Sequence, residues 1–258
     1  MVKTTCVFIG GKQIGANCIR QLIERGVRPE LVIANPDDTG ANTWHESLVK
    51  IAQTARLETL IGHKVREPEI IKRLGTIKPE IIFCIGGMQI VPPEVLAMPR
   101  FGILNIHPAL LPKYRGRFST AHAIFNGEKT HGVTLHWMDE GIDTGPVIMQ
   151  EQFTIDDDDT AKIVYDKFTE VGSSLFKKFL DLWLSGDEII ATHQDESQAT
   201  YYPKGLPGNG TVDWSWNGEQ IRNWIRAMTF EPFAPASFHI GEKKMLIIDE
   251  KYFKGFDK

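Results

Sequence analysis

Short apolar runs alternate with amphipathic segments along the first half of the chain. Each run spans four to six residues and is bounded by Gly, Pro or Asn, which is typical of strands buried on both faces of a parallel sheet. The segments between the runs have apolar residues every three or four positions, as helices that cover a sheet do. The expected strands are 5–10, 31–34, 58–61, 81–85 and 103–106, and the expected helices are 12–25, 44–56 and 67–77. This order predicts a Rossmann-like, doubly wound and mostly parallel α/β sheet.

The second half of the chain predicts longer helices and then a change of composition. A long helix with one continuous apolar face follows a shorter helix and an alternating strand. From Ala191 onward, Trp, Tyr, Gly and Pro become frequent. The expected elements are helix 118–125, strand 132–137, helix 160–184, helix 217–228 and a hairpin of 237–240 with 245–248.

These patterns divide the chain into two expected domains. Residues 1–190 should form the α/β domain, and residues 191–258 a small C-terminal α/β appendage of a helix plus a hairpin. The appendage is too short for an independent core, because chains below ~40–70 residues are marginal without disulfides or metals. Its large apolar side chains must therefore be buried on the α/β domain, on a second copy of the chain or on a ligand.

Composition narrows the classes of function. The 258 residues carry a net charge of -4, which provides no bulk attraction to nucleic acid or to an anionic membrane. No apolar run reaches membrane-spanning length, and the start leads directly into a strand without a signal peptide, so we expect a cytoplasmic protein. The three cysteines are far apart and form neither a disulfide framework nor a zinc motif.

We expect no bound metal. The histidines do not pair with carboxylates at the spacing of a metal site. His122 is expected to be structural, and His131 and His136 are expected to be scaffold or rim residues. The acidic run at 156–159 lacks the glycine and distal glutamate of an EF-hand loop. These carboxylates are better explained as charge partners for the N-terminus of the long helix.

The first strand ends in a glycine turn that does not fit a nucleotide cofactor. Gly10-Gly-Lys-Gln-Ile-Gly15 has Lys12 where the dinucleotide fingerprint needs a glycine, and it lacks the Lys-Ser/Thr of a phosphate-binding loop. NAD and ATP are therefore excluded at this turn. Lys12 is either a solvated loop residue or a phosphate contact at the helix N-terminus.

Asn105 and His107 are the strongest candidates for chemistry. They are two residues apart in a strand, so both side chains leave the same face, and Pro108 then ends the strand. Ligands of open α/β sheets bind at the carboxyl ends of strands. The turn after the preceding strand has two glycines followed by Met88, Ile90 and Val91, which suits a flat heteroaromatic ring or, alternatively, is simply the loop before a helix at Pro92.

Two stretches carry a resemblance to a known family. The first reads Asn105-Ile-His107-Pro108, Leu110-Leu-Pro112 and Tyr114-Arg115-Gly116, and the second reads Asp139-Glu-Gly141-Ile-Asp143-Thr-Gly145. Together they resemble the folate-dependent formyltransferases, which carry Asn-x-His-Pro, Leu-Leu-Pro and (Tyr/Trp)-Arg-Gly, then Asp-x-Gly-x-Asp-Thr-Gly. The resemblance is specific from about residue 81 to 152 and weaker on both sides.

The resemblance implies a set of site residues and a co-substrate, 10-formyltetrahydrofolate. The implied catalytic residues are Asn105, His107 and Asp143. One half of the implied pterin pocket is Gly86, Gly87, Met88, Gln89, Ile90 and Val91, and the other half is Asp139, Glu140, Gly141 and Ile142. Expected substrate contacts are Lys12, Arg115, Tyr201 and Tyr202, although the tail aromatics fit packing equally well.

These residue types suit formyl transfer to a neutral amine. Negative charge develops on the formyl oxygen during attack, so a preorganised donor there lowers the barrier, and the Asn105 amide, joined by His107, can supply it. Imidazole has a suitable pKa for proton transfer. The resemblance implies that Asp143 orients His107 or relays the proton, and the sequence leaves the base role open between His107 and Asp143.

The acceptor is expected to be a nucleotide-linked amino sugar, for example a dTDP-linked amino-dideoxy sugar made for a surface polysaccharide such as the O-antigen of lipopolysaccharide. Glycinamide ribonucleotide is disfavoured because the Ser-Asn phosphate loop of that enzyme family is missing. Methionyl-tRNA is disfavoured by the net charge and because a further barrel domain would follow the connector at 225–238. A silent folate- or nucleotide-binding module is disfavoured because all three catalytic residues are present. We also expect a homodimer formed largely by the tail.

Overall fold

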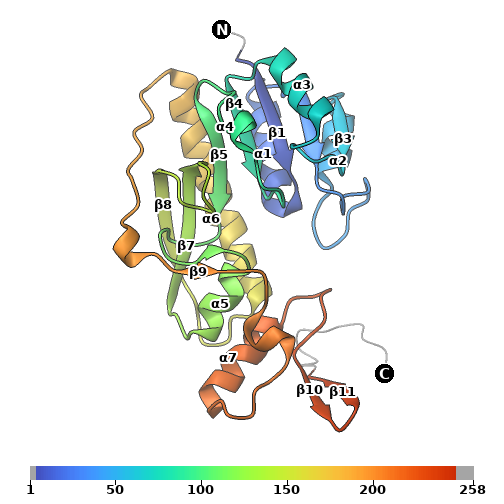
Figure 1. Ribbon diagram of the computed structural model, residues 1–258, viewed down its shortest axis with the longest axis vertical. Helices are drawn as coiled ribbons and strands as arrows, with labels where there is room; N and C mark the ends of the chain where they lie inside the picture. The colour runs from blue at the N-terminus through green and yellow to red at the C-terminus, as the bar shows by residue number, and fades with distance from the viewer. Residues whose placement is uncertain (1–3, 248–258) are drawn as a thin grey trace. The chain divides into compact units, whose positions relative to one another are not determined.

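The computed structural model describes residues 4–247, and its strands and helices follow the apolar runs closely. Figure 1 shows the order of the elements along the chain. The strands are β1 (Cys6–Gly10), β2 (Leu31–Ala34), β3 (Thr59–Ile61), β4 (Ile81–Ile85), β5 (Gly102–His107), β6 (Arg115–Gly116), β7 (Thr130–Trp137), β8 (Val147–Thr154), β9 (Tyr201–Tyr202), β10 (Ser237–Ile240) and β11 (Lys243–Leu246). The helices are α1 (Lys12–Glu24), α2 (Leu48–Thr54), α3 (Pro68–Ile77), α4 (Pro93–Leu96), α5 (Ser119–Phe125), α6 (Ala161–Ser185) and α7 (Gly218–Met228), with single 3-10 turns at Glu196–Gln198 and Pro207–Gly210.

Seven strands form the main sheet in the order β3-β2-β1-β4-β5-β7-β8. The first five are parallel, and β7 is antiparallel to β5. The chain runs outward from β1 to β3 and then returns to β4 on the other side of β1. This reversal between β1 and β4 is the place where a doubly wound sheet opens a crevice for ligands. The predicted Rossmann-like α/β class is confirmed.

Helices cover both faces of the parallel strands because successive side chains point to opposite faces. On one face, Val7 and Ile82 share a buried cluster with the apolar residues of α3 and α4. On the other face, the Phe83 ring packs edge-on against Phe176 and Trp183 of α6, with ring centroids 5.6 and 5.5 Å apart. This packing fixes the positions of the strand ends that carry the candidate site.

The turns after β1 and β4 contact each other through their backbones. Gly10 is paired with Ile85 in the register of the two strands, and the Gly11 N–H donates to the Ile85 carbonyl oxygen at 3.2 Å. Gly86 has φ +63°, and a Cβ there would lie 2.2 Å from the Gly11 carbonyl oxygen. Only a glycine fits both the left-handed backbone and this close approach.

Contacts divide the chain into two compact units that interleave in sequence. The first contains the residues up to His107 together with 134–150 and 171–194, and the second contains 108–133, 151–170 and the chain from Asp195 onward. These units do not coincide with the expected domains 1–190 and 191–258, and that domain division stays a prediction. Three elements, β7, β8 and α6, have residues in both units, so no single position in the sequence separates the units.

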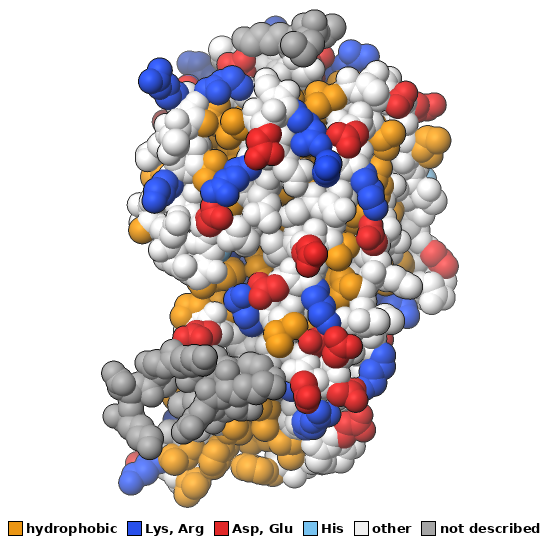
Figure 2. All heavy atoms as spheres, turned by 180° about the vertical axis from the view of Figure 1, so that it is seen from behind, with side chains coloured by type: hydrophobic (Ala, Val, Ile, Leu, Met, Phe, Trp, Pro, Cys, Tyr) orange, Lys and Arg blue, Asp and Glu red, His pale blue; other side chains and the backbone are white. Residues whose placement is uncertain are grey.

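The second unit buries part of the C-terminal tail against α5. Ala121 and Ile124 of α5 share a buried cluster with Ala227 of α7. Trp224 is fully buried and donates its indole N–H to the Pro207 carbonyl oxygen at 3.1 Å. The tail thus uses the preceding chain as its core, the first of the three expected solutions. In Figure 2, hydrophobic side chains still gather at the lower end of the view, where this unit exposes apolar residues.

Several elements differ from the sequence expectations, and the two-residue strands β6 and β9 were not expected at all. Helix α2 begins at Leu48 and not near Trp44, because the Ser47 hydroxyl caps it by accepting from the Lys50 N–H at 3.0 Å. Strand β8 was not predicted, since it lies at the sheet edge with half-exposed side chains and therefore lacks a continuous apolar run. The hairpin is present as β10 and β11, although residue 248 of the expected second strand lies outside the described residues. No helix among residues 4–247 is long and apolar enough to cross a membrane.

Replacing Gly86 by alanine should destabilise the first unit. The left-handed backbone alone costs a non-glycine residue about 1–2 kcal/mol, and the contact with the Gly11 carbonyl adds to it, so we expect a loss of at least about 2 kcal/mol in the free energy of unfolding. The matched control is Gly75→Ala in α3, where nothing lies within 4 Å of the added Cβ. Urea unfolding of both variants measures the difference, and equal effects would contradict the assignment.

Candidate active site

Strand β5 carries Asn105 and His107 to the site on one face of the sheet. The intervening residue, Ile106, and the preceding Leu104 point to the opposite face, where both are buried. His107 is 4% exposed, and it is the last residue of the strand. The alternation predicted from the sequence is therefore the one observed.

The loop between β7 and β8 brings Asp143 to these two residues. Asp139 organises the loop by accepting from the Gly141 N–H at 3.1 Å and from the Thr144 hydroxyl at 2.6 Å. The Gln194 amide donates to the carbonyl oxygens of Asp143 and Gly145 at 2.9 and 2.7 Å. Asp143 itself has φ +56°, a left-handed conformation that is uncommon outside functional sites and turns.

Gly145 is the residue that lets this loop close against β7. A Cβ at this position would lie 1.8 Å from the Trp137 carbonyl oxygen. The Trp137 N–H also donates to the Pro146 carbonyl oxygen at 3.0 Å, so the loop is pinned where it leaves and rejoins the sheet. This close approach explains why a Gly follows Asp143-Thr144.

The structure brings Asn105, His107 and Asp143 together as predicted. His107 Nδ1 lies 3.4 Å from Asp143 Oδ2, and the Asn105 amide nitrogen lies 3.5 Å from Asp143 Oδ1. The Asp143 carboxylate therefore contacts the amide with one oxygen and the imidazole with the other. An amide donor and an imidazole that both contact one carboxylate can stabilise an oxyanion and move a proton.

His136 is a fourth member that the sequence interpretation missed. It is directly opposite Asn105 in the antiparallel pairing of β5 and β7, and its Nε2 lies 3.0 Å from the Asn105 amide nitrogen. Its Nδ1 lies 2.9 Å from the Trp137 carbonyl oxygen, which can only accept. Nδ1 must therefore carry the proton, Nε2 accepts, and Asn105 must present its NH2 group and not its carbonyl oxygen.

The environment of His136 keeps it neutral. Burial and, to a smaller extent, the nearby His107 lower the pKa of His136 to about 4, although the Asp143 carboxylate acts in the opposite direction. A neutral ring is the form that can accept from Asn105. His136 was expected to be a scaffold or rim residue, and the register of two strands distant in sequence places it in contact with Asn105. The only sequence signal was its position in an alternating strand.

The loop after β4 presents apolar side chains beside a bare backbone. Met88 is 54% and Ile90 79% exposed, and Gly87 lies between them and the strand end. Val91, an expected pocket residue, instead buries its side chain in the core at 6% exposure. The Gln89 amide contacts backbone atoms of the segment after β3.

The second half of the expected pocket is the outer part of the Asp143 loop. Glu140, Gly141 and Ile142 are exposed, while the Asp139 carboxylate is engaged within the loop. Like the loop after β4, this loop combines an exposed apolar side chain, Ile142, with a glycine, Gly141. Both segments belong to the first unit.

The four expected substrate contacts have different surroundings. Lys12 forms an ion pair with Asp37 and lies 5.6 Å from the centroid of the Trp44 ring. In the second unit, the Arg115 guanidinium forms two bonds to Glu196, at 2.8 and 2.6 Å.

The two tail tyrosines also differ from each other. Tyr202 stacks with Tyr114 at 5.2 Å and with His122 at 4.2 Å, and its hydroxyl accepts from Asn126 at 2.7 Å. This ring packs within the second unit. Tyr201 is exposed, so of the two tyrosines it is the one whose ring is open to a ligand.

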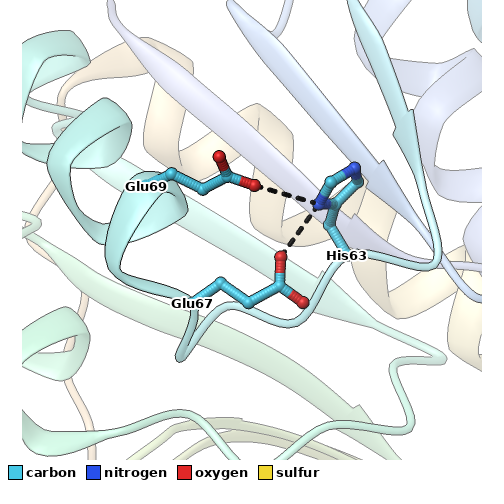
Figure 3. Close-up of side chains that lie close together, drawn as sticks. All are labelled: His63, Glu67 and Glu69. Carbon is cyan, nitrogen blue, oxygen red and sulfur yellow. Dashed lines mark hydrogen bonds and ion pairs between the residues drawn. The ribbon is translucent and has the colours of Figure 1, made fainter.

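One cluster among the described residues has the composition of a metal site. Figure 3 shows His63 Nδ1 facing two carboxylates, at 2.9 Å from Glu67 Oε2 and 3.8 Å from Glu69 Oε1. The other Glu67 oxygen accepts from the Lys64 N–H at 2.9 Å, and Glu67 and Glu69 lie at the N-terminus of α3. A backbone hydrogen bond and the His63 contact lower the pKa of Glu67. The arrangement is explained by a turn and a helix start, so the absence of a metal stays a prediction.

Known proteins similar to this chain are formyl transferases. Residues 3–180 match the family described as Formyl transferase, and residues 207–256 match Formyl transferase, C-terminal domain. A methionyl-tRNA formyltransferase of Thermodesulfovibrio yellowstonii is 31% identical over 252 residues, which cover 96% of this chain and 80% of that protein.

Two solved structures are also similar. The N-formyltransferase of Helicobacter canadensis, in complex with folinic acid and dTDP-3-aminofucose, is 26% identical with a TM-score of 0.76, over 94% of this chain and 86% of that one. WlaRD, a sugar 3N-formyl transferase solved with dTDP and 5-N-formyl-THF, is 27% identical with a TM-score of 0.74, over 90% and 81%.

The match at 207–256 changes one sequence argument. A methionyl-tRNA substrate was disfavoured because no further domain was expected after the connector. Since this part of the chain matches the C-terminal domain found in formyl transferases, chain length does not count against that substrate. The net charge of the protein still disfavours methionyl-tRNA as the substrate.

The neutral state of His136 predicts a pH dependence of stability. Its folded pKa of about 4 lies below the ordinary 6.5, so between these values the unfolded chain binds a proton that the folded protein does not. This contribution is complete above pH 6.5 and is lost as the pH falls toward 4. The difference in unfolding free energy between the wild type and His136→Gln should shrink between pH 7 and 4.5 in urea titrations. A constant difference for His136→Gln would contradict the neutral state of His136.

Proposed function

The chain belongs to the formyl transferase family, and from that premise we propose that it transfers a formyl group from 10-formyltetrahydrofolate to the amino group of a nucleotide-linked amino sugar. The observation that carries the proposal is the cluster of Asn105, His107 and Asp143 beside two loops with exposed apolar side chains. A dTDP-linked amino-dideoxy sugar destined for a surface polysaccharide such as an O-antigen is the acceptor class we favour.

The loops of the first unit fit a flat heteroaromatic ring such as the pterin of a folate. The exposed Met88, Ile90 and Ile142 provide apolar surface, and the backbone at Gly87 and Gly141 carries no side chain that would cover a ring edge. Exposure of large apolar side chains to water is unfavourable, and a ligand that covers them gains free energy by burying this surface. We propose that 10-formyltetrahydrofolate lies between residues 86–91 and 139–142 and supplies the formyl carbon.

The role of Asn105 follows from its contacts. One N–H of its amide is held by His136 Nε2 at 3.0 Å, while the contact of the amide nitrogen with Asp143 is long, at 3.5 Å. The second N–H is therefore weakly engaged and can donate to the formyl oxygen as that atom becomes negative. Removing a single preorganised donor of this kind typically costs about 100- to 1000-fold in turnover.

The proton of the attacking amine is proposed to leave through His107. Asp143 Oδ2 lies on the Nδ1 side of the ring, so a proton held at Nδ1 leaves Nε2 as the basic nitrogen. Asp143 then orients the ring and stabilises its charged form, while Nε2 accepts the proton from the amine. The ring returns this proton to the folate nitrogen as the bond between that nitrogen and the formyl carbon breaks. This assignment divides the roles that the sequence left open.

The amino sugar is preferred because the charges around the site do not suit RNA. Loops 35–47 and 138–146 carry three carboxylates each and no Lys or Arg, and loop 86–92 carries no charge. An RNA backbone needs a basic surface, so these loops would repel it. Similar sugar N-formyltransferases crystallised with dTDP compounds support the same choice.

Methionyl-tRNA is the second candidate, since a curated relative acting on it is 31% identical to this chain. The proposal is tested by offering the full chain 10-formyltetrahydrofolate with dTDP-linked amino sugars, methionyl-tRNA and glycinamide ribonucleotide in separate reactions. Mass spectrometry of each product should detect formylation of an amino sugar. Formylation of methionyl-tRNA alone would identify tRNA as the acceptor and refute the amino sugar. No formylation of any acceptor would indicate a folate- or nucleotide-binding module without activity.

Removing the catalytic groups should abolish most of the turnover. His107→Ala takes away the base, and Asp143→Asn removes the charge that orients it, so we expect each to lower kcat by roughly a hundredfold or more. His193→Ala and Asp187→Asn, both exposed and outside the site, are the matched controls. Near-normal turnover of a folded His107→Ala protein would refute the assignment.

We also propose that the protein is a homodimer joined through the tail. The exposed apolar residues there are Trp214, Phe233, Ile240, Met245 and Leu246. A group of this kind marks an interaction surface, and twofold dimers are the commonest closed assemblies.

Placing a charge within this surface should separate the two copies. Ile240→Asp in β10 should convert the dimer to a monomer in light scattering, because a carboxylate would be buried without a partner. The control is Lys244→Asp on the neighbouring strand β11, which leaves the apolar side chains intact. A monomeric wild type, or a dimeric Ile240→Asp protein, would contradict the proposal.

A further inference from the structure

The side chain of Gln89 is occupied on both ends by backbone atoms of another loop. Its Oε1 accepts from the Val65 N–H at 2.8 Å, and its Nε2 donates to the His63 carbonyl oxygen at 3.0 Å. The two partners lie in the segment between β3 and α3, more than twenty residues earlier in the chain. A planar amide that pairs with a backbone N–H and a backbone C=O fixes both position and orientation.

The segment that Gln89 contacts is itself well anchored. Val65 is fully buried in the core cluster beneath α3 and α4. His63 and the Lys64 N–H both contact the Glu67 carboxylate at 2.9 Å, at the start of α3 (Figure 3). Gln89 therefore ties its loop to a rigid part of the first unit.

A second amide holds the beginning of the same loop. Asn35, at the end of β2, donates from Nδ2 to the Gly86 carbonyl oxygen at 2.9 Å and is almost fully buried. With Val91 buried in the core, the loop is fixed at its start, middle and end. The side chains between these points are Met88 and Ile90, and they are the ones left exposed.

We propose that Gln89 is a positioning residue for the folate site: it does not contact the co-substrate, but it holds Met88 and Ile90 in the conformation that covers the pterin. The inference rests on the proposed function, because it assigns the folate to this loop. A loop that is already ordered loses less conformational entropy when the ligand binds, so affinity depends on the Gln89 contacts.

Binding of folinic acid, a stable formyl folate, tests the proposal with the full-length protein. Gln89→Met keeps the length of the side chain and removes both hydrogen bonds, and calorimetry should show a Kd for folinic acid raised about tenfold. Gln89→Glu keeps only the bond from the Val65 N–H and should have an intermediate Kd. The exposed Gln53→Met in α2 is the control and should bind as the wild type does.

Two further readouts separate positioning from other roles. At saturating folate, kcat of Gln89→Met should stay within about threefold of the wild type while KM for the folate rises, because the reacting groups are unchanged. Hydrogen exchange of the Val65 amide should stay slow when folinic acid binds to the wild type. Faster exchange in that complex would show Gln89 leaving Val65 to contact the ligand, and would overturn the inference.

The outcomes for the two proposals are distinguishable. A wild-type protein that does not bind folinic acid would refute the proposed function itself. A wild type that binds, together with a folded Gln89→Met protein of unchanged Kd, would refute only the positioning role. A loss of thermal stability with an unchanged Kd of the folded fraction would likewise make Gln89 a structural residue. If Gln89→Met does not fold, the Gln89→Glu variant carries the same comparison.

Discussion

The register of β5 between β4 and β7 is the constraint on which the site depends. Parallel pairing aligns Ile103 with Ile82 of β4, and antiparallel pairing places His136 opposite Asn105. A slip of one residue would turn Asn105 and His107 into the core and bring Leu104 and Ile106 out of it. The buried apolar side chains of β5 therefore fix Asn105 and His107, and the free energy that holds them in place comes from the core packing of the sheet.

The loops around the site are held by side-chain amides that contact backbone atoms. Gln194 fixes the Asp143 loop, and Asn35 and Gln89 fix the loop after β4. Neutral amides suit this task because they donate and accept without introducing charge beside the carboxylates of the site. The result is an uncharged or acidic surround, which suits a long polyanion such as RNA poorly.

The sequence predicts the parts of the structure that depend on local pattern. Apolar runs locate the parallel strands, and the motif around Asn105, His107 and Asp143 identifies three residues that the structure brings together. What it could not predict depends on contacts between distant segments. The role of His136 follows from strand register, and the link between Gln89 and Val65 follows from loop packing. Strand β8 lacks an apolar run because it lies at the sheet edge, and the interleaving of the two units follows from tertiary contacts alone.

A crystal structure of the protein with folinic acid would test the central claim most directly. The account predicts that the pterin lies between residues 86–91 and 139–142, with the Asn105 amide nitrogen within hydrogen-bond distance of the formyl oxygen and still bonded to His136 Nε2. A folate bound elsewhere would contradict the account. So would a formyl oxygen that faces away from Asn105, or an Asn105 amide that turns its carbonyl oxygen toward His136.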